Sequence, residues 1–309
     1  PGQAQTWKSA AYRHNGGPNT PPGTAVPERQ TLDLLLQTLT PEPVGDDRFI
    51  ADNTHPEGQR LYGGQVLAQS LRAAVATVDP ERRVHSQHAY FLRPGDPRVP
   101  VELAVERARD GASFSSRRVV ASQHGKPILV SSLSFQLVQP GDDFQADLPD
   151  VPEPESLPSE RERELATGSF EPDFQIITGL DLDVRVVDPV DWYHPVPREA
   201  RLQSWMRTTG SVGDGTGLHE ALLAYMSDAF LVDVTLLPHG RSFHGDMQIA
   251  SLDHALWFHA PFRADEWLLN DVVAERVGGS RGLGRGRFFS RDGRLVASCM
   301  QESLQRRSE

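Results

Sequence analysis

A single charged side chain interrupts an apolar stretch in the second half of the chain. Asp228 is the one acidic or basic residue between positions 222 and 231. A charge is costly there unless it is solvated or hydrogen-bonded. A carboxylate within reach of a water molecule can take its proton as a general base. Alternatively, Asp228 lies on the solvated face of a helix, and the residues alone leave both interpretations open.

Three other side chains of this half could take part in chemistry. Cys299 could accept an acyl group, but its largely apolar run, residues 295–300, is more typical of a buried packing residue. His254 and His259 could act as acid or base, although a histidine beside strand aromatics is more often structural. No Gly-x-Ser-x-Gly elbow leads from a strand into a helix, so a Ser-His-Asp hydrolase has no local support.

A glycine-rich segment, residues 278–286, could suggest a phosphate-binding loop. It leads into the strand-like residues 287–289 instead of a helix, so we interpret it as a turn at the edge of a sheet. Several arginines could meet phosphate groups, although strand arginines also commonly line a solvated face. These candidates are Arg93, Arg117, Arg118, Arg281 and Arg285.

Composition excludes several classes of protein. The 309 residues favour two domains over one. No apolar run reaches 18 residues, so no membrane span is expected. The formal net charge of −11 disfavours nonspecific binding to nucleic acid. Cys299 is the single cysteine, which excludes an intramolecular disulfide and a multi-cysteine metal site and favours a cytoplasmic location.

Proline and acidic residues divide the chain near its middle. We predict a flexible tail over 1–30, a first domain over 31–139, a linker over 140–190 and a second domain over 191–309.

Each predicted domain has the same order of elements. In the first, a helical pattern opens at residues 63–65, and strands alternate from residue 101 and run from 128 to 135. In the second, a helix near 217–232 precedes strands near 247–259 and 267–276 and a final pair flanking the turn 291–293.

The two halves also share residues in register. His88-Ala89 resembles His254-Ala255, and the segment 130–132 resembles 296–298, with both pairs separated by 166 residues. A repeat of this size indicates duplicated domains. A long helix followed by antiparallel strands predicts an α+β fold in which a sheet wraps one central helix. We therefore expect a double hot-dog.

Particular motifs in both halves resemble the bacterial acyl-CoA thioesterase II family, over roughly residues 31–305. In the first half these are 62–66, 85–96 and 110–114. In the second half they are 225–228, 249–255 with 257–259, and 296–298 with 301–302.

The resemblance implies a hydrolase of acyl-CoA, acting in fatty acid metabolism, that uses no cofactor and no metal. It places an acid, a hydroxyl and an amide around one nucleophilic water, and by motif these are Asp228, Ser251 and Gln301. Serine stands where the bacterial pattern has threonine, and both offer a hydroxyl. The internal repeat places Gln65 opposite Asp228 and His85 opposite Ser251, so one site per chain is expected. The family also implies a homo-oligomer of double hot-dog units.

Details of the mechanism and two other functions remain open at this point. A developing oxyanion needs donors, and we expect backbone N–H groups of the helix around 225–230 to supply one. A hot-dog enoyl-CoA hydratase or dehydratase would use an Asp/His pair on a similar substrate, and product identity separates it from a thioesterase. A non-catalytic acyl-CoA binding module is the other alternative.

Overall fold

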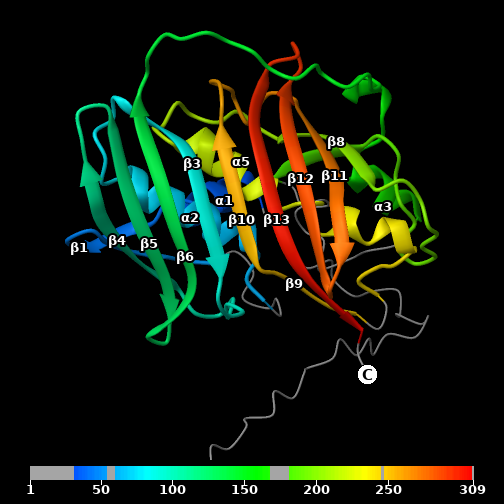
Figure 1. Ribbon diagram of the computed structural model, residues 1–309, viewed down its shortest axis with the longest axis horizontal. Helices are drawn as coiled ribbons and strands as arrows, with labels where there is room; N and C mark the ends of the chain where they lie inside the picture. Colours follow the sequence, from blue (N-terminus) through cyan, green and yellow to red (C-terminus); the bar gives the residue numbers. More distant parts are fainter. Residues whose placement is uncertain (1–30, 54–59, 168–180, 245–246, 308–309) are drawn as a thin grey trace, which may run out of the picture.

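The computed structural model describes residues 31–53, 60–167, 181–244 and 247–307 (Figure 1). The predicted tail, 1–30, lies outside these residues. The first part of the chain forms α1 (Leu32–Thr38), β1 (Glu42–Gly45), β2 (Arg48–Ala51), α2 (Gly63–Val75), β3 (Arg82–Phe91), β4 (Val101–Asp110), β5 (Phe114–Gln123) and β6 (Lys126–Leu137). The connection contains η1 (Pro154–Ser156) and α3 (Glu160–Thr167). The second part forms β7 (Leu182–Val186), β8 (Arg201–Thr208), α5 (Leu218–Ser227), η3 (Asp233–Thr235), η4 (Leu237–His239), β9 (Met247–Ser251), β10 (Asp253–Phe258), β11 (Leu268–Gly278), β12 (Arg281–Ser290) and β13 (Leu295–Arg307).

Thirteen strands within the described residues form one antiparallel sheet. Its order is β1-β2-β4-β5-β6-β3-β10-β13-β12-β11-β8-β7, with β9 also paired to β13. From either outer edge the strands follow the same order, so the two halves repeat one topology and join where β3 pairs with β10. This confirms the double hot-dog prediction.

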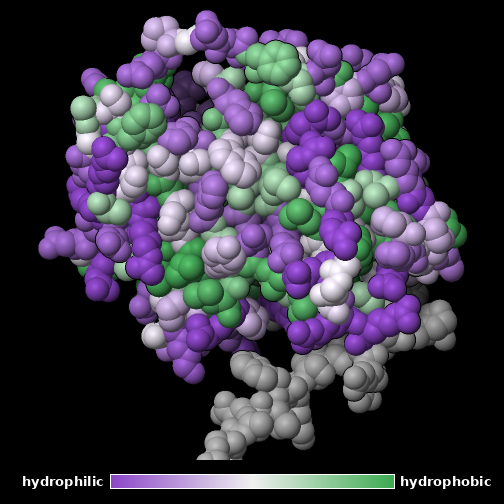
Figure 2. Space-filling view, viewed as in Figure 1, coloured by the Kyte–Doolittle hydropathy of each residue, from purple (hydrophilic) through white to green (hydrophobic). Residues whose placement is uncertain are grey.

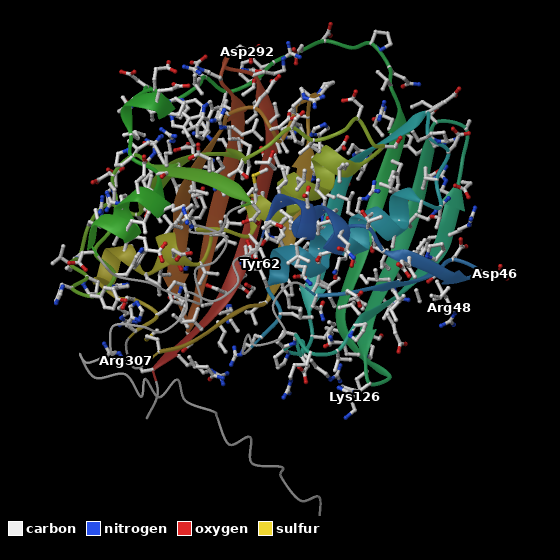
Figure 3. The ribbon with its side chains drawn as sticks, turned by 180° about the vertical axis from the view of Figure 1, so that it is seen from behind. Asp46, Arg48, Tyr62, Lys126, Asp292 and Arg307 are labelled. Atoms are coloured by element: carbon white, nitrogen blue, oxygen red, sulfur yellow. The ribbon has the colours of Figure 1, made fainter. Side chains whose placement is uncertain are left out.

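Two helices lie side by side behind the sheet, where Figure 3 shows them from the back. α2 contacts β3 to β6 on one side and α5 on the other, and ten of its residues are buried. Its mostly apolar sequence reflects this burial on several sides. The start of α2 meets the end of α5, and Arg72 near the end of α2 donates to the Thr216 carbonyl before α5. The two helices are therefore antiparallel. None of the helices in the described ranges is long and apolar enough to cross a membrane.

The helix predicted over 217–232 is shorter in the structure. α5 ends at Ser227, Asp228 is its C-cap, and Phe230 has a φ of 68° in the left-handed region. That conformation cannot continue an α-helix. The chain instead passes through η3, which lies against β11 and β12.

The glycine-rich segment was predicted as a turn, which is wrong for most of its length. Only Gly279 and Ser280, with φ of 60° and 59°, form the turn between β11 and β12. Residues 278–282 fit Gly-x-Ser-x-Gly spacing, yet they join two strands and make no elbow into a helix. Within β12, Gly284 faces inward, and a Cβ there would lie 2.3 Å from the Leu231 carbonyl oxygen. Glycine lets the segment after α5 lie directly on the strand.

The segment predicted as a linker is partly built into the fold. β7 pairs with β8, and Leu148 and Val151 pack against the buried Trp205 and Trp267. Arg291 holds the same segment through ion pairs to Glu153 and Glu155. Figure 1 shows the chain crossing above the sheet between β6 and α3. The proline-rich composition of this segment gave no sign of these contacts. The division of the chain into two domains stays a prediction.

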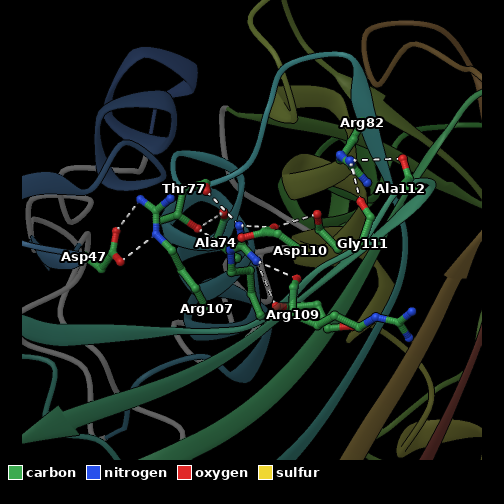
Figure 4. Close-up of polar contacts among 12 residues, drawn as sticks. Asp47, Ala74, Thr77, Arg82, Arg107, Arg109, Asp110, Gly111 and Ala112 are labelled. Carbon is green, nitrogen blue, oxygen red and sulfur yellow. Dashed lines mark hydrogen bonds and ion pairs between the residues drawn. The ribbon is translucent and has the colours of Figure 1, made fainter.

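The far end of α2 is held by a buried arginine. Arg117, 2% exposed, donates to the Thr77 carbonyl and hydroxyl and to Asp110 Oδ1, beside the Asp47–Arg107 pair (Figure 4). A cation there satisfies carbonyls at a helix end. Arg117, considered above as a phosphate partner, is thus a structural residue.

The open face of the sheet, seen in Figure 2, mixes apolar and polar side chains. His88 lies on this side and is exposed, whereas His254 is 1% exposed. Successive residues of a strand face opposite sides. The predicted match of His88 with His254 is therefore out of register by one residue, and the buried Gln87 occupies the position comparable to His254.

Candidate active site

Two of the three predicted site residues are in direct contact. Gln301 on β13 donates from Nε2 to the Ser251 hydroxyl on β9 at 2.9 Å. Gln301 is 1% exposed and Ser251 is partly buried. A buried amide is stable only when hydrogen-bonded, and its other end, Oε1, lies 2.5 Å from His254 Nδ1 on β10.

A break between two strands brings these side chains to one face. β9 ends at Ser251 and β10 begins at Asp253, while the intervening Leu252 bonds through its own backbone to Glu302. Residues three apart in an uninterrupted strand would face opposite sides. An irregularity of this kind redirects side chains, so Ser251 and His254 both reach Gln301.

The third predicted residue joins this cluster through its chain neighbour. His254 Nε2 lies 3.0 Å from the Ser227 hydroxyl, and Ser227 directly precedes Asp228. A continuous path of hydrogen bonds therefore runs from Ser251 through Gln301 and His254 to the end of α5. Asp228 makes no direct hydrogen bond to Ser251 or Gln301 within the described residues.

Asp228 is held by the opposite half of the molecule. Its Oδ2 accepts the Gly64 N–H at 2.9 Å, at the second position of α2. The N-terminus of a helix carries partial positive charge and free N–H groups, so it favours an anionic carboxylate. Oδ1 of Asp228 is buried and has no hydrogen-bond partner among the described residues. One oxygen thus fixes the carboxylate and the other is free to accept a proton.

Two tyrosines and a glycine pair bring the halves this close. The Tyr62 hydroxyl donates to the Tyr225 carbonyl at 2.9 Å, and the two rings meet edge to face. Figure 3 labels Tyr62 near the middle of the molecule, between the halves. A Cβ on Gly63 would lie 2.7 Å from Asp228 Oδ2, and one on Gly64 would lie 2.4 Å from the Tyr225 carbonyl. The contact therefore depends on glycine at both positions.

Burial sets the protonation of the groups around Asp228. Burial lowers the pKa of His254, while the Asp228 charge acts in the opposite direction. Burial raises the pKa of Asp233 to about 7, and the Asp228 charge adds to the effect. Burial raises the pKa of Cys299 to about 12, which makes its thiol a poor nucleophile and favours the packing interpretation.

Several expectations about the site need correction. The helix around 225–230, expected to supply a backbone N–H donor to the oxyanion, ends at Ser227, and a helix end presents carbonyls instead of free N–H groups. The N-terminus that faces Asp228 belongs to α2. In the first half of the chain, the two residues that the internal repeat placed opposite Asp228 and Ser251 have other partners: Gln65 bonds Asn53, and His85 bonds Ser134. No cluster among the described residues could hold a metal ion.

A surface cavity of about 550 Å³ lies elsewhere. Its lining includes Asp47, Phe49, Thr77 and Arg107, at the opposite end of α2 from Gly64. The 13 residues of α2 separate the two places by about 20 Å. None of the three predicted site residues lines this cavity.

Sequence reasoning missed Gly64 and Ser227, and it named His254 only as an acid, a base or a structural residue. The adjacent glycines at a helix start were a usable signal, because such pairs mark close backbone approach. His254 was assigned a structural role, and no local pattern linked it to Gln301, 47 residues away.

The fold defines a double hot-dog protein, and the polar cluster lies where its two halves meet. The family model of the acyl-CoA thioesterase C-terminal domain matches residues 146–305, and that of the N-terminal domain matches residues 50–136. Acyl-coenzyme A thioesterase 8 of Mus musculus is 39% identical over 285 residues, 88% of either chain. The chain therefore belongs to the acyl-CoA thioesterase II family of thioester hydrolases.

Two other comparisons cover nearly the whole chain. Acyl-CoA thioesterase 2 of Haemophilus influenzae is 34% identical over 282 residues, covering 90% of this chain and 99% of the relative. A crystal structure of an acyl-CoA thioesterase II from Mycobacterium marinum is 39% identical, with a TM-score of 0.73, and covers 89% of this chain and 98% of its own.

Proposed function

We propose that the chain hydrolyses acyl-CoA to a free fatty acid and coenzyme A, using a water activated by Asp228 and oriented by Ser251 and Gln301. The observation that carries this proposal is the asymmetric environment of Asp228. Oδ2 is fixed by the Gly64 amide, while the buried Oδ1 has no described partner. A carboxylate held at one oxygen can accept a proton at the other without losing its position.

The reaction then needs only the chain's own groups and one water. The water oxygen adds to the thioester carbonyl carbon as Asp228 takes its proton. The C–S bond breaks when the carbonyl re-forms, and the departing sulfur takes the proton from Asp228. Ser251, whose hydroxyl accepts from Gln301, keeps its own hydrogen for a further acceptor.

A serine nucleophile is less consistent with the contacts. Ser227, the serine bonded to His254, is fully buried and also lies 3.0 Å from the Ala224 carbonyl. Ser251 has Gln301 as its partner, and an amide cannot remove its proton. These contacts favour attack by water.

The test is thiol release from acyl-CoAs of graded chain length by wild type and Asp228→Asn. Loss of a general base lowers rates by roughly 10²–10⁴-fold, and we expect kcat to fall within this range. Asp253→Asn is the matched control, because the Asp253 carboxylate lies next to His254 but accepts from the Glu302 amide, a bond that asparagine can keep. Wild-type rates in Asp228→Asn would require a different base.

The same assay separates the other functions. An enoyl-CoA hydratase would hydrate enoyl-CoA and release no thiol, and a binding module would bind acyl-CoA without turnover. Both ring nitrogens of His254 are engaged by protein groups, which disfavours the Asp/His pair of a hydratase.

We also propose a homo-oligomer in the cytoplasm. Tyr90 and Leu92, on and just after the central strand β3, are 63% and 47% exposed and could support association. The one cysteine is a free thiol, as a reducing compartment allows. Sedimentation and localisation of the tagged protein would test these two points.

A further inference from the structure

His254 is fixed at both of its ring nitrogens. Nε2 lies 3.0 Å from the Ser227 hydroxyl and Nδ1 lies 2.5 Å from Gln301 Oε1. The side chain is 1% exposed, so the ring lies between the two groups instead of facing solvent. It links the end of α5, which carries Asp228, to the strand that carries Gln301.

The partners determine where the ring carries its proton. With Oε1 of Gln301 facing the ring, Nδ1 must be the donor, because an amide oxygen only accepts; the reversed amide would instead require the ring hydrogen on Nε2. In a neutral ring Nε2 then accepts, and the Ser227 hydroxyl supplies the hydrogen. The Ser227 hydroxyl can also donate to the Ala224 carbonyl at 3.0 Å, but with hydrogen on Nδ1 the Nε2 atom has a donor only if Ser227 turns its hydrogen to the ring.

This arrangement decides which end of the Gln301 amide faces Ser251. With Oε1 held by the ring, the NH₂ end donates to the Ser251 hydroxyl at 2.9 Å. If the amide were reversed, its oxygen would face Ser251 and would take the hydroxyl hydrogen. Ser251 would then have no hydrogen left for the reacting water.

We propose that His254 is a positioning residue that orients the Gln301 amide toward Ser251 and ties it, through Ser227, to the segment carrying Asp228. The proposal rests on the proposed function, because it assigns the orientation that the water-activating groups need. His254 itself touches neither substrate nor the reacting water. Its loss should lower kcat and leave KM nearly unchanged.

Two conservative variants separate the two nitrogens. Asparagine places its NH₂ near the position of Nδ1, so His254→Asn can still donate to Gln301 but loses the hydrogen bond to Ser227. Glutamine reaches toward the position of Nε2, so His254→Gln can bond Ser227 but not orient Gln301. Both variants keep a polar side chain at a buried site, and their melting temperatures report any loss of fold.

We expect kcat of His254→Gln to fall about 100-fold, as misplacement of a catalytic group by about 1 Å can do. We expect the kcat of His254→Asn to stay within roughly tenfold of wild type. KM should change less than about threefold in both His254 variants. His259→Asn is the control, because His259 also bonds a serine, Ser298, at 2.9 Å but is exposed. Equal kcat in the two His254 variants, or loss that follows melting temperature alone, overturns the proposal.

A second measurement does not depend on activity. Nitrogen-15 NMR of histidine-labelled wild type, with His254→Asn to assign the signal, should show hydrogen on Nδ1 of His254, and hydrogen on Nε2 alone contradicts the proposal. Asp228→Asn is assayed alongside. If it is inactive while His254→Gln is fully active, only this inference fails; if it is fully active, the proposed function fails and this inference with it.

Discussion

Asp233→Asn should make the protein more stable, and increasingly so as the pH rises. Asp233 lies in η3, is 8% exposed, and has its pKa raised from 3.8 to about 7 by burial, with the Asp228 charge adding to the shift. In the unfolded chain this carboxyl ionises above 3.8, whereas in the folded protein it stays protonated until about 7. Folding is therefore opposed across this window.

The size of the effect follows from the two pKa values. Each unit of difference corresponds to about 1.36 kcal/mol, so the full penalty above the folded pKa is about 4 kcal/mol. At about pH 5, this free-energy penalty on folding is only about 1.6 kcal/mol. Asparagine has nearly the same shape and no charge, so its advantage over aspartate should grow by about 2–3 kcal/mol between about pH 5 and about pH 8.

The assay is denaturant unfolding of wild type and Asp233→Asn at both pH values. Comparing the two proteins at each pH cancels the titration of every other group. In an Asp228→Asn background, the stability advantage of Asp233→Asn should grow less between the two pH values, because the Asp228 charge no longer raises the pKa of Asp233. A difference between the two proteins that is the same at both pH values would show that Asp233 does not titrate as burial requires.

Three shorter predictions concern packing and chemistry. Gly284→Ala should destabilise by about 1–3 kcal/mol or more in thermal unfolding, because its Cβ would lie 2.3 Å from the Leu231 oxygen; Gly45→Ala, with nothing within 4 Å, is the control, and equal effects contradict the packing argument. Cys299 should resist a chromogenic disulfide in native protein and react once unfolded, and fast native reaction would show it is accessible. Ser251→Thr should stay within about tenfold of wild-type kcat while Ser251→Ala loses about 100-fold, and similar rates in both would exclude a role for the hydroxyl.

Strands and their repeat could be predicted from the sequence because the signal is local. Val101, Leu103 and Val105 recur at every second position, form part of β4 and are all buried. The turn at Asp292-Gly293 separates β12 from β13 as expected. Such patterns depend on one buried face, which each strand carries in its own residues.

The remaining errors concern contacts between distant segments. Gly284 resembled a loop residue because its role, making room for Leu231, depends on a segment 53 residues earlier. The end of α5 is set by the left-handed conformation of Phe230, which propensity does not forecast for an aromatic residue. The position of Ser251 was suggested only by family resemblance, since its partner Gln301 is 50 residues away.

The pairing of β3 with β10 and the Gly64–Asp228 bond make the two halves mutually dependent. Cut apart, each half would expose a long unpaired strand edge, a surface prone to aggregation. The carboxyl-terminal fragment would keep Asp228, Ser251 and Gln301 yet lose the amide that anchors the acid. Any activity recovered from the two fragments would depend on their concentration, because the competent carboxylate forms only on reassociation.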